Sequence, residues 1–265
     1  MTILMKELTL EKVATGPVAV RVYEGAANTA DAPVLLFFHG GAFTGTLPKR
    51  SLFAETAAQA GATVVLPDYN APLGGIFPKP LETGFSIFSC LAQKRAGLGN
   101  RKSKLFVGGV EAGANVAAAV ALKARDHFAD ELDGQILLSP LLDPYMASAS
   151  MREADALGMR ERWSEGWSHY LSGGMCHPYA APCTCSRLSG VAPALVLTSE
   201  DDPLRDETFG YAAALKASGV DVHQHVLPAG TGWPSIYGAK SNDIASWQAC
   251  AARQFADFVH AIGIQ

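Results

Sequence analysis

The sequence predicts an α/β fold with a mostly parallel β-sheet covered by helices on both faces. Short, almost continuously apolar runs alternate along the chain with longer segments of helical periodicity. Strands have such almost continuously apolar sequences when helices bury both faces of a parallel sheet. The chain has 265 residues and is 49% hydrophobic, which is enough to bury one large core. Because no repeat or low-complexity linker is visible, we expect residues 1–265 to form a single domain.

The predicted elements follow one another in a regular order. An opening β-hairpin is expected at residues 7–14 and 18–25. Apolar strands are expected at residues 33–41, 62–70, 104–109, 134–140, 194–200 and 220–228. Helices are expected at residues 48–61, 80–97, 112–127, 206–219 and 242–263. Gly61 closes the first of these helices, since glycine is favoured just after a helix C-terminus.

Residues 144–190 interrupt this alternation, because they carry no strand although they lie between two expected strands. Within them, MREADALGMRERWSEGWSHYL (151–171) has helical spacing and two tryptophans. We expect this insertion to form a cap or lid over the carboxyl ends of the strands, where ligands bind in such sheets. Four aromatic side chains could line an apolar pocket, although packing in the core is the more common role of such residues. They are Trp163, Trp167, Tyr170 and Trp233.

Charge and hydropathy exclude two classes of partner. The chain has 21 Lys and Arg against 25 Asp and Glu, a net charge of −4, and no basic run that would indicate nucleic-acid binding. Residues 1–16 are too polar and interrupted for the apolar region of a signal peptide. No stretch approaches the roughly 18 uninterrupted apolar residues of a membrane span. We therefore expect a soluble, cytoplasmic protein, and the sequence does not predict its oligomeric state.

Five cysteines, an odd number in a chain without an export signal, indicate free thiols. Cys176, Cys183 and Cys185 cluster beside His177. Their spacing is not that of the usual structural zinc sites, so a thiol-bearing loop is favoured over a zinc site. No metal and no cofactor are expected.

Residues 106–116, FVGGVEAGANV, join an apolar strand to a helix of small residues. This strand–turn–helix frame is that of the nucleophile elbow, G-x-S-x-G, in α/β-hydrolases. Gly109 and Gly113 stand at the glycine positions of the motif, and Glu111 stands at its serine position. The sequence thus places a carboxylate where this motif has its nucleophile.

Three further segments belong to the same pattern. HGGAF, residues 39–43, ends a strand, and its glycines let backbone N–H groups turn toward an anion. EDDPLRDE, residues 200–207, directly follows a later strand. The loop LPAGTGWPSIYG, residues 227–238, occupies the place where a catalytic histidine is expected, and it contains none.

In this order, the motifs resemble the hormone-sensitive-lipase-like esterases of the α/β-hydrolase superfamily. DYNAP (68–72) and GQILLSPLLD (134–143) are similar to further segments of that family, and the resemblance covers about residue 18 to the end. It implies the α/β-hydrolase fold, with a small helical cap inserted at residues 144–190. It also implies activity of esterase or lipase type on a small-molecule ligand or substrate, apolar and carrying a carbonyl group.

Carried over residue by residue, the resemblance assigns the parts of a site. Gly40 and Gly41 match the glycines of the oxyanion loop, and Ala112, after the elbow position, adds a further N–H group. Asp202 matches the acid of the catalytic triad. Since Asp202 follows a strand and precedes a helix, a purely structural role as a helix cap is also open.

The resemblance also indicates which catalytic parts are lost. Glu111 replaces the nucleophilic serine, and the family's P-G-x-x-H-G-F pattern becomes P-A-G-T-G-W, one residue shorter. Thr231 or Gly232 stands near the missing histidine, and Ala42 replaces the third glycine of the oxyanion loop. The triad is therefore degenerate at two of its three positions.

The remaining histidines offer no clear substitute for the missing base. His223 and His225 alternate within the last strand and are expected to face a helix layer or solvent. His39 is expected to pack and orient its own loop, while His169 and His177 lie in the predicted cap. A base must reach its target within hydrogen-bond distance, which the sequence does not establish for any of them.

Glu111 stands at a helix N-terminus, where free N–H groups and the helix dipole favour a carboxylate. We therefore expect its side chain to lie among the oxyanion-binding N–H groups as a built-in anion. Roles as nucleophile or as general base stay open, since epoxide hydrolases and haloalkane dehalogenases resemble this arrangement with an aspartate nucleophile.

Three functions follow from these alternatives, and whether the chain is an enzyme stays open. The favoured one is a small-molecule-binding pseudo-hydrolase without ordinary serine esterase activity. The second is an enzyme that uses Glu111 as base or nucleophile on a small ester, lactone or epoxide. The third, an active carboxylesterase, is disfavoured because loss of triad members removes several orders of magnitude in rate.

Overall fold

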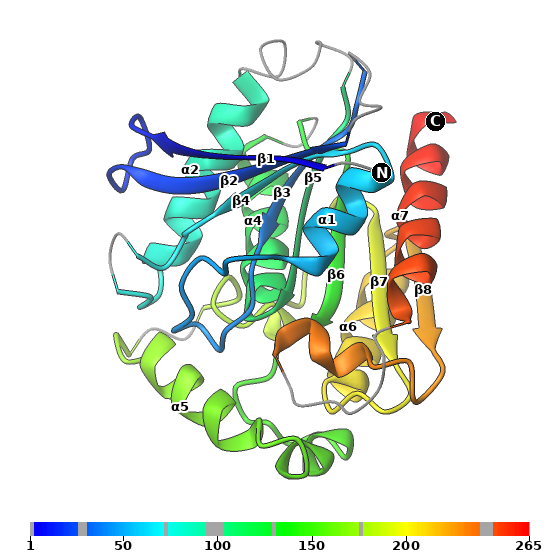
Figure 1. The fold of residues 1–265 in the computed structure, drawn as a ribbon. Helices are drawn as coiled ribbons and strands as arrows, with labels where there is room; N and C mark the ends of the chain where they lie inside the picture. Colours follow the sequence, from blue (N-terminus) through cyan, green and yellow to red (C-terminus); the bar gives the residue numbers. More distant parts are fainter. Residues whose placement is uncertain are drawn as a thin grey trace.

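The computed structural model describes residues 3–25, 31–71, 74–93, 103–128, 131–174, 177–238 and 246–264. They form an eight-stranded sheet in the order β1-β2-β4-β3-β5-β6-β7-β8 (Figure 1). The strands are β1 (Ile3–Leu10), β2 (Val18–Gly25), β3 (Val34–Phe38), β4 (Thr63–Pro67), β5 (Leu105–Glu111), β6 (Gly134–Pro140), β7 (Ala194–Ser199) and β8 (Val222–Leu227).

The sheet is mostly parallel, as the sequence predicts. From β4 to β8 all neighbouring strands pair in parallel. Only β2 runs the other way, pairing antiparallel with β1 and with β4. The strands β3, β4, β5, β6 and β7 are buried along their whole length, which explains why their sequences are mostly apolar.

Helices cover both faces of the sheet. The main ones are α1 (Leu52–Gln59), α2 (Lys79–Gln93), α4 (Ala112–His127), α6 (Arg205–Ala217) and α7 (Trp247–Ile264). On one face α1 packs against α7, and on the other α2 packs against α4 (Figure 1). The small side chains of α4 are buried on nearly every side, and they let this helix pack closely on β5 and β6. The predicted fold is thereby confirmed.

Some predicted boundaries differ from the observed ones. The first helix begins at Leu52 rather than at residue 48, because Ser51 has an extended backbone and its side chain accepts a hydrogen bond from Ala54 N. The first strand begins at Ile3, before the predicted residue 7. The 227–238 loop contains a 3-10 helix, η3 (Trp233–Tyr237), that the sequence did not predict. Residues 94–97 of the second predicted helix lie outside the described residues.

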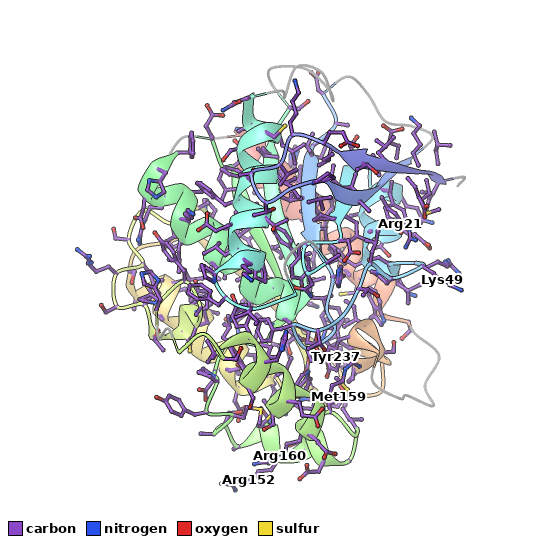
Figure 2. The ribbon with its side chains drawn as sticks, turned by 90° about the vertical axis from the view of Figure 1, so that its left-hand side faces the viewer. Arg21, Lys49, Arg152, Met159, Arg160 and Tyr237 are labelled. Atoms are coloured by element: carbon purple, nitrogen blue, oxygen red, sulfur yellow. The ribbon has the colours of Figure 1, made fainter. Side chains whose placement is uncertain are left out.

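The inserted segment, residues 144–190, carries helical turns and no strand in its described part. It holds η1 (Ser150–Asp155), α5 (Arg160–Tyr170) and η2 (Pro182–Thr184). In Figure 1, α5 lies beyond the ends toward which the arrows of β6, β7 and β8 point. Figure 2 shows Arg152 and Arg160 of this segment at the lower edge of the molecule, well away from Arg21 of β2. That this segment acts as a cap or lid stays a prediction.

Candidate active site

The turn between β5 and α4 has the tight geometry that the G-x-E-x-G motif requires. Glu111 has φ 56° and ψ −121°, a conformation that is unfavourable for a residue with a side chain. A Cβ on Gly113 would overlap the Phe38 carbonyl of β3, and one on Gly109 would overlap Gly113 itself. Only glycine fits at both positions. The chain therefore keeps the strained frame of an elbow around a glutamate.

The Glu111 carboxylate is fully buried and accepts hydrogen bonds on both oxygens. Its Oε2 lies 2.9 Å from Ala42 N and 3.4 Å from Ala112 N, and it also accepts from Gly41 N. The acceptor therefore lies at the N-terminus of α4, among backbone N–H groups from two separate loops. This is the arrangement that the built-in anion hypothesis describes.

The two glycines of the 39–43 loop have different roles. Gly41 donates its N–H to Glu111, whereas Gly40 provides space, because a Cβ there would lie 2.7 Å from Oε2. The second donor from this loop is Ala42, which the sequence marked only as a departure from the family pattern. Ala42 has a positive φ of 52°, so an alanine here holds a conformation that usually calls for glycine.

The indole N–H of Trp163 is the donor to the other carboxylate oxygen, with 2.5 Å between Nε1 and Oε1 of Glu111. Trp163 belongs to α5 and is fully buried. Gly166, one turn later, packs so closely that a Cβ on it would overlap the Ala42 carbonyl. The inserted segment therefore packs directly on the loop that surrounds Glu111.

Aromatic stacking extends this contact. The Phe43 ring stacks on Tyr170 with 4.1 Å between centroids and 12° between planes, and it lies 4.7 Å from the Trp167 ring. Residues 163, 166, 167 and 170 share one face of α5, as their spacing predicts. The aromatic side chains of α5 are thus part of the core rather than the lining of an open pocket.

Asp202 is buried beyond β7 and its hydrogen-bonding capacity is filled. The Trp233 indole N–H donates to its Oδ2 at 2.9 Å. Its other donors are the hydroxyls of Ser139, Thr198 and Tyr237 and the backbone N–H of Leu204. Burial raises the pKa of Asp202, and hydrogen bonds, first among them that from Ser139, act in the opposite direction.

The residue beside the acid is Trp233, not Thr231. The Thr231 hydroxyl donates to the Pro228 carbonyl at 3.1 Å and does not contact Asp202. Gly232 adopts a left-handed conformation with φ 70°, after which the 3-10 helix η3 directs Trp233 into the core. From the sequence, Trp233 was noted only as one of four aromatic residues. Its indole N–H, in the loop where the family has its histidine, was the signal that could have identified it as the partner of Asp202.

No described histidine hydrogen-bonds to Glu111 or Asp202. His39 Nδ1 donates to the Gly40 carbonyl at 2.7 Å, which fits the predicted role of orienting its loop, and burial lowers its pKa. His223 lies 3.6 Å from the Asp221 carboxylate, and His225 lies 3.2 Å from the Cys250 sulfur. Both are on β8, as predicted, and neither reaches the elbow.

The cysteine cluster is only partly within the described residues, because Cys176 lies outside them. Cys183 donates to the Leu142 carbonyl at 2.9 Å and Cys185 to the Arg187 carbonyl at 3.3 Å, while His177 accepts from Tyr179 N. Within the described part of the chain, no three His, Cys, Asp or Glu side chains are grouped as metal ligands would be. In the same part, no helix has the length and apolar character needed to cross a membrane.

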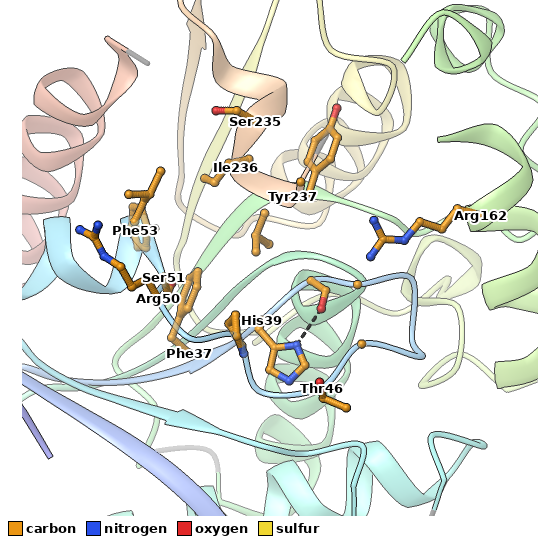
Figure 3. Close-up of a pocket in the computed structure, with 17 residues that line it drawn as sticks. Phe37, His39, Thr46, Arg50, Ser51, Phe53, Arg162, Ser235, Ile236 and Tyr237 are labelled. Atoms are coloured by element: carbon orange, nitrogen blue, oxygen red, sulfur yellow. Dashed lines mark hydrogen bonds between the residues drawn. The ribbon is translucent and has the colours of Figure 1, made fainter. Parts of the chain in front are cut away.

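A cavity of about 540 Å³ lies beside the 39–43 loop, and Gly40 and Gly41 are among its lining residues (Figure 3). Its walls come from β3, the start of α1, α5 and η3. They include Leu52, Val110, Arg162, Ile236 and Tyr237. Neither Glu111 nor Asp202 lines it. The space that a small molecule could occupy is thus adjacent to the elbow but separate from its carboxylate.

Comparisons with known proteins agree on one family. A family model for the alpha/beta hydrolase fold matches residues 35–231. Esterase LipI of Mycobacterium tuberculosis is 30% identical over 220 residues, 79% of this chain and 68% of LipI. A hyperthermophilic esterase from the archaeon Pyrobaculum calidifontis superimposes with a TM-score of 0.82 and 26% identity, covering 99% of this chain and 87% of that one. Gibberellin receptor GID1B of Arabidopsis thaliana is 25% identical over 252 residues, 89% of this chain and 68% of the receptor.

Proposed function

The chain belongs to the α/β-hydrolase fold family and is of the esterase and lipase type, and we propose that it binds a small molecule without ordinary serine esterase activity. The observation that carries the proposal is the Glu111 carboxylate, which stands at the nucleophile position and accepts the N–H groups of Gly41, Ala42 and Ala112. An anion of the protein itself fills the place where a reacting oxyanion would need those donors.

The neighbourhood of Asp202 supports the same proposal. In a serine hydrolase, an imidazole takes the proton from the serine and is oriented by the acid. Here the group on Asp202 is the Trp233 indole, whose N–H is shared between Asp202 Oδ2 and Ser139 Oγ and which has no lone pair to accept a proton. The acid therefore orients a group that has no base function. Nucleophile, base and oxyanion site are each replaced by groups that hold the fold together.

The alternative in which Glu111 attacks or deprotonates a substrate has less support. Its side chain is fully buried, both oxygens accept hydrogen bonds, and it does not line the cavity. A substrate would have to displace the Trp163 indole from Oε1 to reach it. Such a displacement would leave a buried N–H group without a partner, at a cost of about 1–3 kcal/mol.

The cavity beside the loop supports the binding part of the proposal. At about 540 Å³ it is within the usual size range for small-molecule sites. Its apolar side chains agree with the predicted ligand, a small apolar molecule with a carbonyl group. One of the similar proteins, GID1B, is named as a receptor, which also supports a binding role for this chain.

The proposal is tested by two assays on the purified protein. We expect no labelling by a fluorophosphonate and no hydrolysis of short p-nitrophenyl esters above the rate of heat-unfolded protein, with an active esterase as positive control. In parallel, a thermal-shift screen of small carbonyl compounds is expected to find a stabilising ligand that is recovered unchanged.

The two assays also separate the alternatives. Labelling of the native protein would establish an active esterase and refute the proposal. Turnover of an ester, lactone or epoxide that disappears in Glu111→Gln would establish the Glu111 enzyme instead. We further propose a cytoplasmic location, which fractionation of cells expressing a tagged chain at its natural level would test.

A further inference from the structure

The cavity beside the 39–43 loop has an asymmetric chemical lining. Leu52, Val110 and Ile236 contribute apolar surface, while the charged groups among its described lining residues are both arginines, Arg50 and Arg162. None of its described lining residues is Asp or Glu. A site with this composition favours a molecule that has an apolar part to pack on these three side chains and negative charge at one end.

The two arginines differ in how far their charge is already compensated. Arg50 forms two hydrogen bonds with Glu55, at 2.9 and 2.7 Å. Arg162 has no ion-pair partner among the described residues. The guanidinium lies close to both Gly41 of the 39–43 loop and Gly238, which directly follows η3. A Cβ built on Gly41 would lie 3.8 Å from its Nη2, and a Cβ built on Gly238 would lie 3.9 Å from its Nη1. Figure 3 shows it extending from α5 toward Tyr237 and the cavity.

His39 does not add to the positive charge of the lining. Its Nδ1 donates to the Gly40 carbonyl, and burial lowers its pKa below the ordinary value of 6.5, so the ring is neutral at pH 7. The cavity therefore offers one uncompensated positive charge, on a planar group that can donate two parallel hydrogen bonds.

We propose that this cavity binds a small apolar monocarboxylate, whose carboxylate pairs with Arg162 and whose apolar part packs on Leu52, Val110 and Ile236. The inference rests on the proposed function, because it names the class of ligand that the same cavity takes. A carboxylate matches the two-pronged guanidinium and the single free charge, whereas a phosphate monoester carries nearly twice the charge.

The buried carboxylate of Glu111 does not oppose this assignment. Glu111 does not line the cavity, and the Gly41, Ala42 and Trp163 N–H groups already compensate its charge. The guanidinium of Arg162 is exposed and free to turn toward a ligand. Because its surroundings are partly solvated, we expect a preference of about tenfold for a charged ligand over its neutral analogue, and not more.

The test uses matched pairs of probes that differ only in charge. Binding of 4-phenylbutyrate and hexanoate is compared with that of 4-phenylbutyramide and hexanamide, by calorimetry on the full-length protein, with phenyl phosphate as a further probe. We expect each acid to bind about tenfold more tightly than its amide. Arg162→Gln should bring the affinities of each acid and its amide to within about twofold of each other, and Arg162→Lys should retain part of the preference. Arg160→Gln, an exchange on a different face of α5 outside the cavity, is the matched control and should behave like the unmodified protein.

The outcomes distinguish this inference from the function on which it rests. If acids and amides bind equally well, or if Arg162→Gln keeps the preference, the carboxylate assignment is wrong while small-molecule binding stands. If phenyl phosphate binds more tightly than the carboxylates, the ligand class is a phosphate and the assignment also fails. If no probe binds, both the carboxylate assignment and the binding role of this cavity are refuted.

Discussion

Replacing Glu111 by alanine tests whether its carboxylate is a structural anion. The exchange leaves four buried N–H groups, those of Gly41, Ala42, Ala112 and the Trp163 indole, without their acceptor. Each unpaired buried donor costs about 1–3 kcal/mol, and water that enters the vacated space recovers part of the sum. We expect a net loss of about 3–5 kcal/mol in the free energy of unfolding.

This loss converts to a measurable change in melting temperature. An unfolding entropy of about 2.1 cal/mol/K per residue gives about 0.56 kcal/mol/K for 265 residues. The expected decrease in Tm is therefore about 5–9 °C. Glu111→Gln keeps the shape of the side chain and one acceptor oxygen, so its decrease should be about half as large. Glu161→Ala, an exposed glutamate on α5, is the control and should change Tm by less than about 1 °C.

Addition of acetate makes this test specific. If the alanine variant leaves an empty anion site, acetate should bind there and raise its Tm in proportion to the logarithm of concentration, as expected for a ligand of the folded state. Sodium chloride at the same ionic strength should have a smaller effect, and the unmodified protein should respond to neither. A Tm of Glu111→Ala within about 1 °C of the unmodified protein, or equal stabilisation of both proteins by acetate, would falsify the built-in anion hypothesis.

Three further predictions follow from the same contacts. Trp163→Phe keeps the ring packing but removes the donor to Oε1 of Glu111, so we expect a loss of about 1–2 kcal/mol, a decrease in Tm of about 2–4 °C, measured by calorimetry. Glu111→Ser alone should stay inactive toward p-nitrophenyl acetate because Trp233 is not a base, whereas the double variant with Trp233→His should become labelled by a fluorophosphonate; labelling of the single variant would contradict this reasoning. Burial raises the pKa of Glu207 from 4.5 to about 8, so between these values the folded chain binds a proton that the unfolded chain has lost. Stability should therefore decrease as pH rises from about 4.5 to 8, and Glu207→Gln should flatten this dependence in denaturant titrations; parallel pH profiles of the two proteins would contradict the assignment.

The fold was predictable from the sequence because its signals are local. The strand at residues 134–140 agrees with the prediction at both ends, since its apolar centre, Ile136 to Leu138, is flanked by Gly134 and Pro140, which often stand near strand ends. The elbow was predictable for a similar reason, because Gly109 and Gly113 are required by contacts within one strand–turn–helix unit and with the adjacent strand. Errors in boundaries came from caps, as at Ser51, whose hydrogen bond decides where a helix begins.

The partners of the two carboxylates were not predictable in the same way. Trp163 reaches Glu111 only because Gly166 lets α5 pack on the Ala42 carbonyl, a contact between residues far apart in the sequence. Trp233 reaches Asp202 only because Gly232 takes a left-handed conformation and a short helix follows. Family motifs identify the positions at which residues have changed, but the replacements depend on packing that a motif does not encode.

The buried carboxylates of Glu111 and Asp202 are stabilised in the same way. A buried carboxylate is costly unless its oxygens accept hydrogen bonds, and each of these two accepts one from an indole N–H group, which cannot accept a proton. Trp163 thereby connects α5 to the elbow, and Trp233 connects the loop after β8 to the end of β7. Any ligand that reached one of these carboxylates would have to separate such a pair. The cavity beside the 39–43 loop avoids this cost, because neither Glu111 nor Asp202 lines it and a molecule can occupy it while both pairs stay intact. A binding role is therefore compatible with a closed, stable elbow, whereas a catalytic role would require that elbow to open.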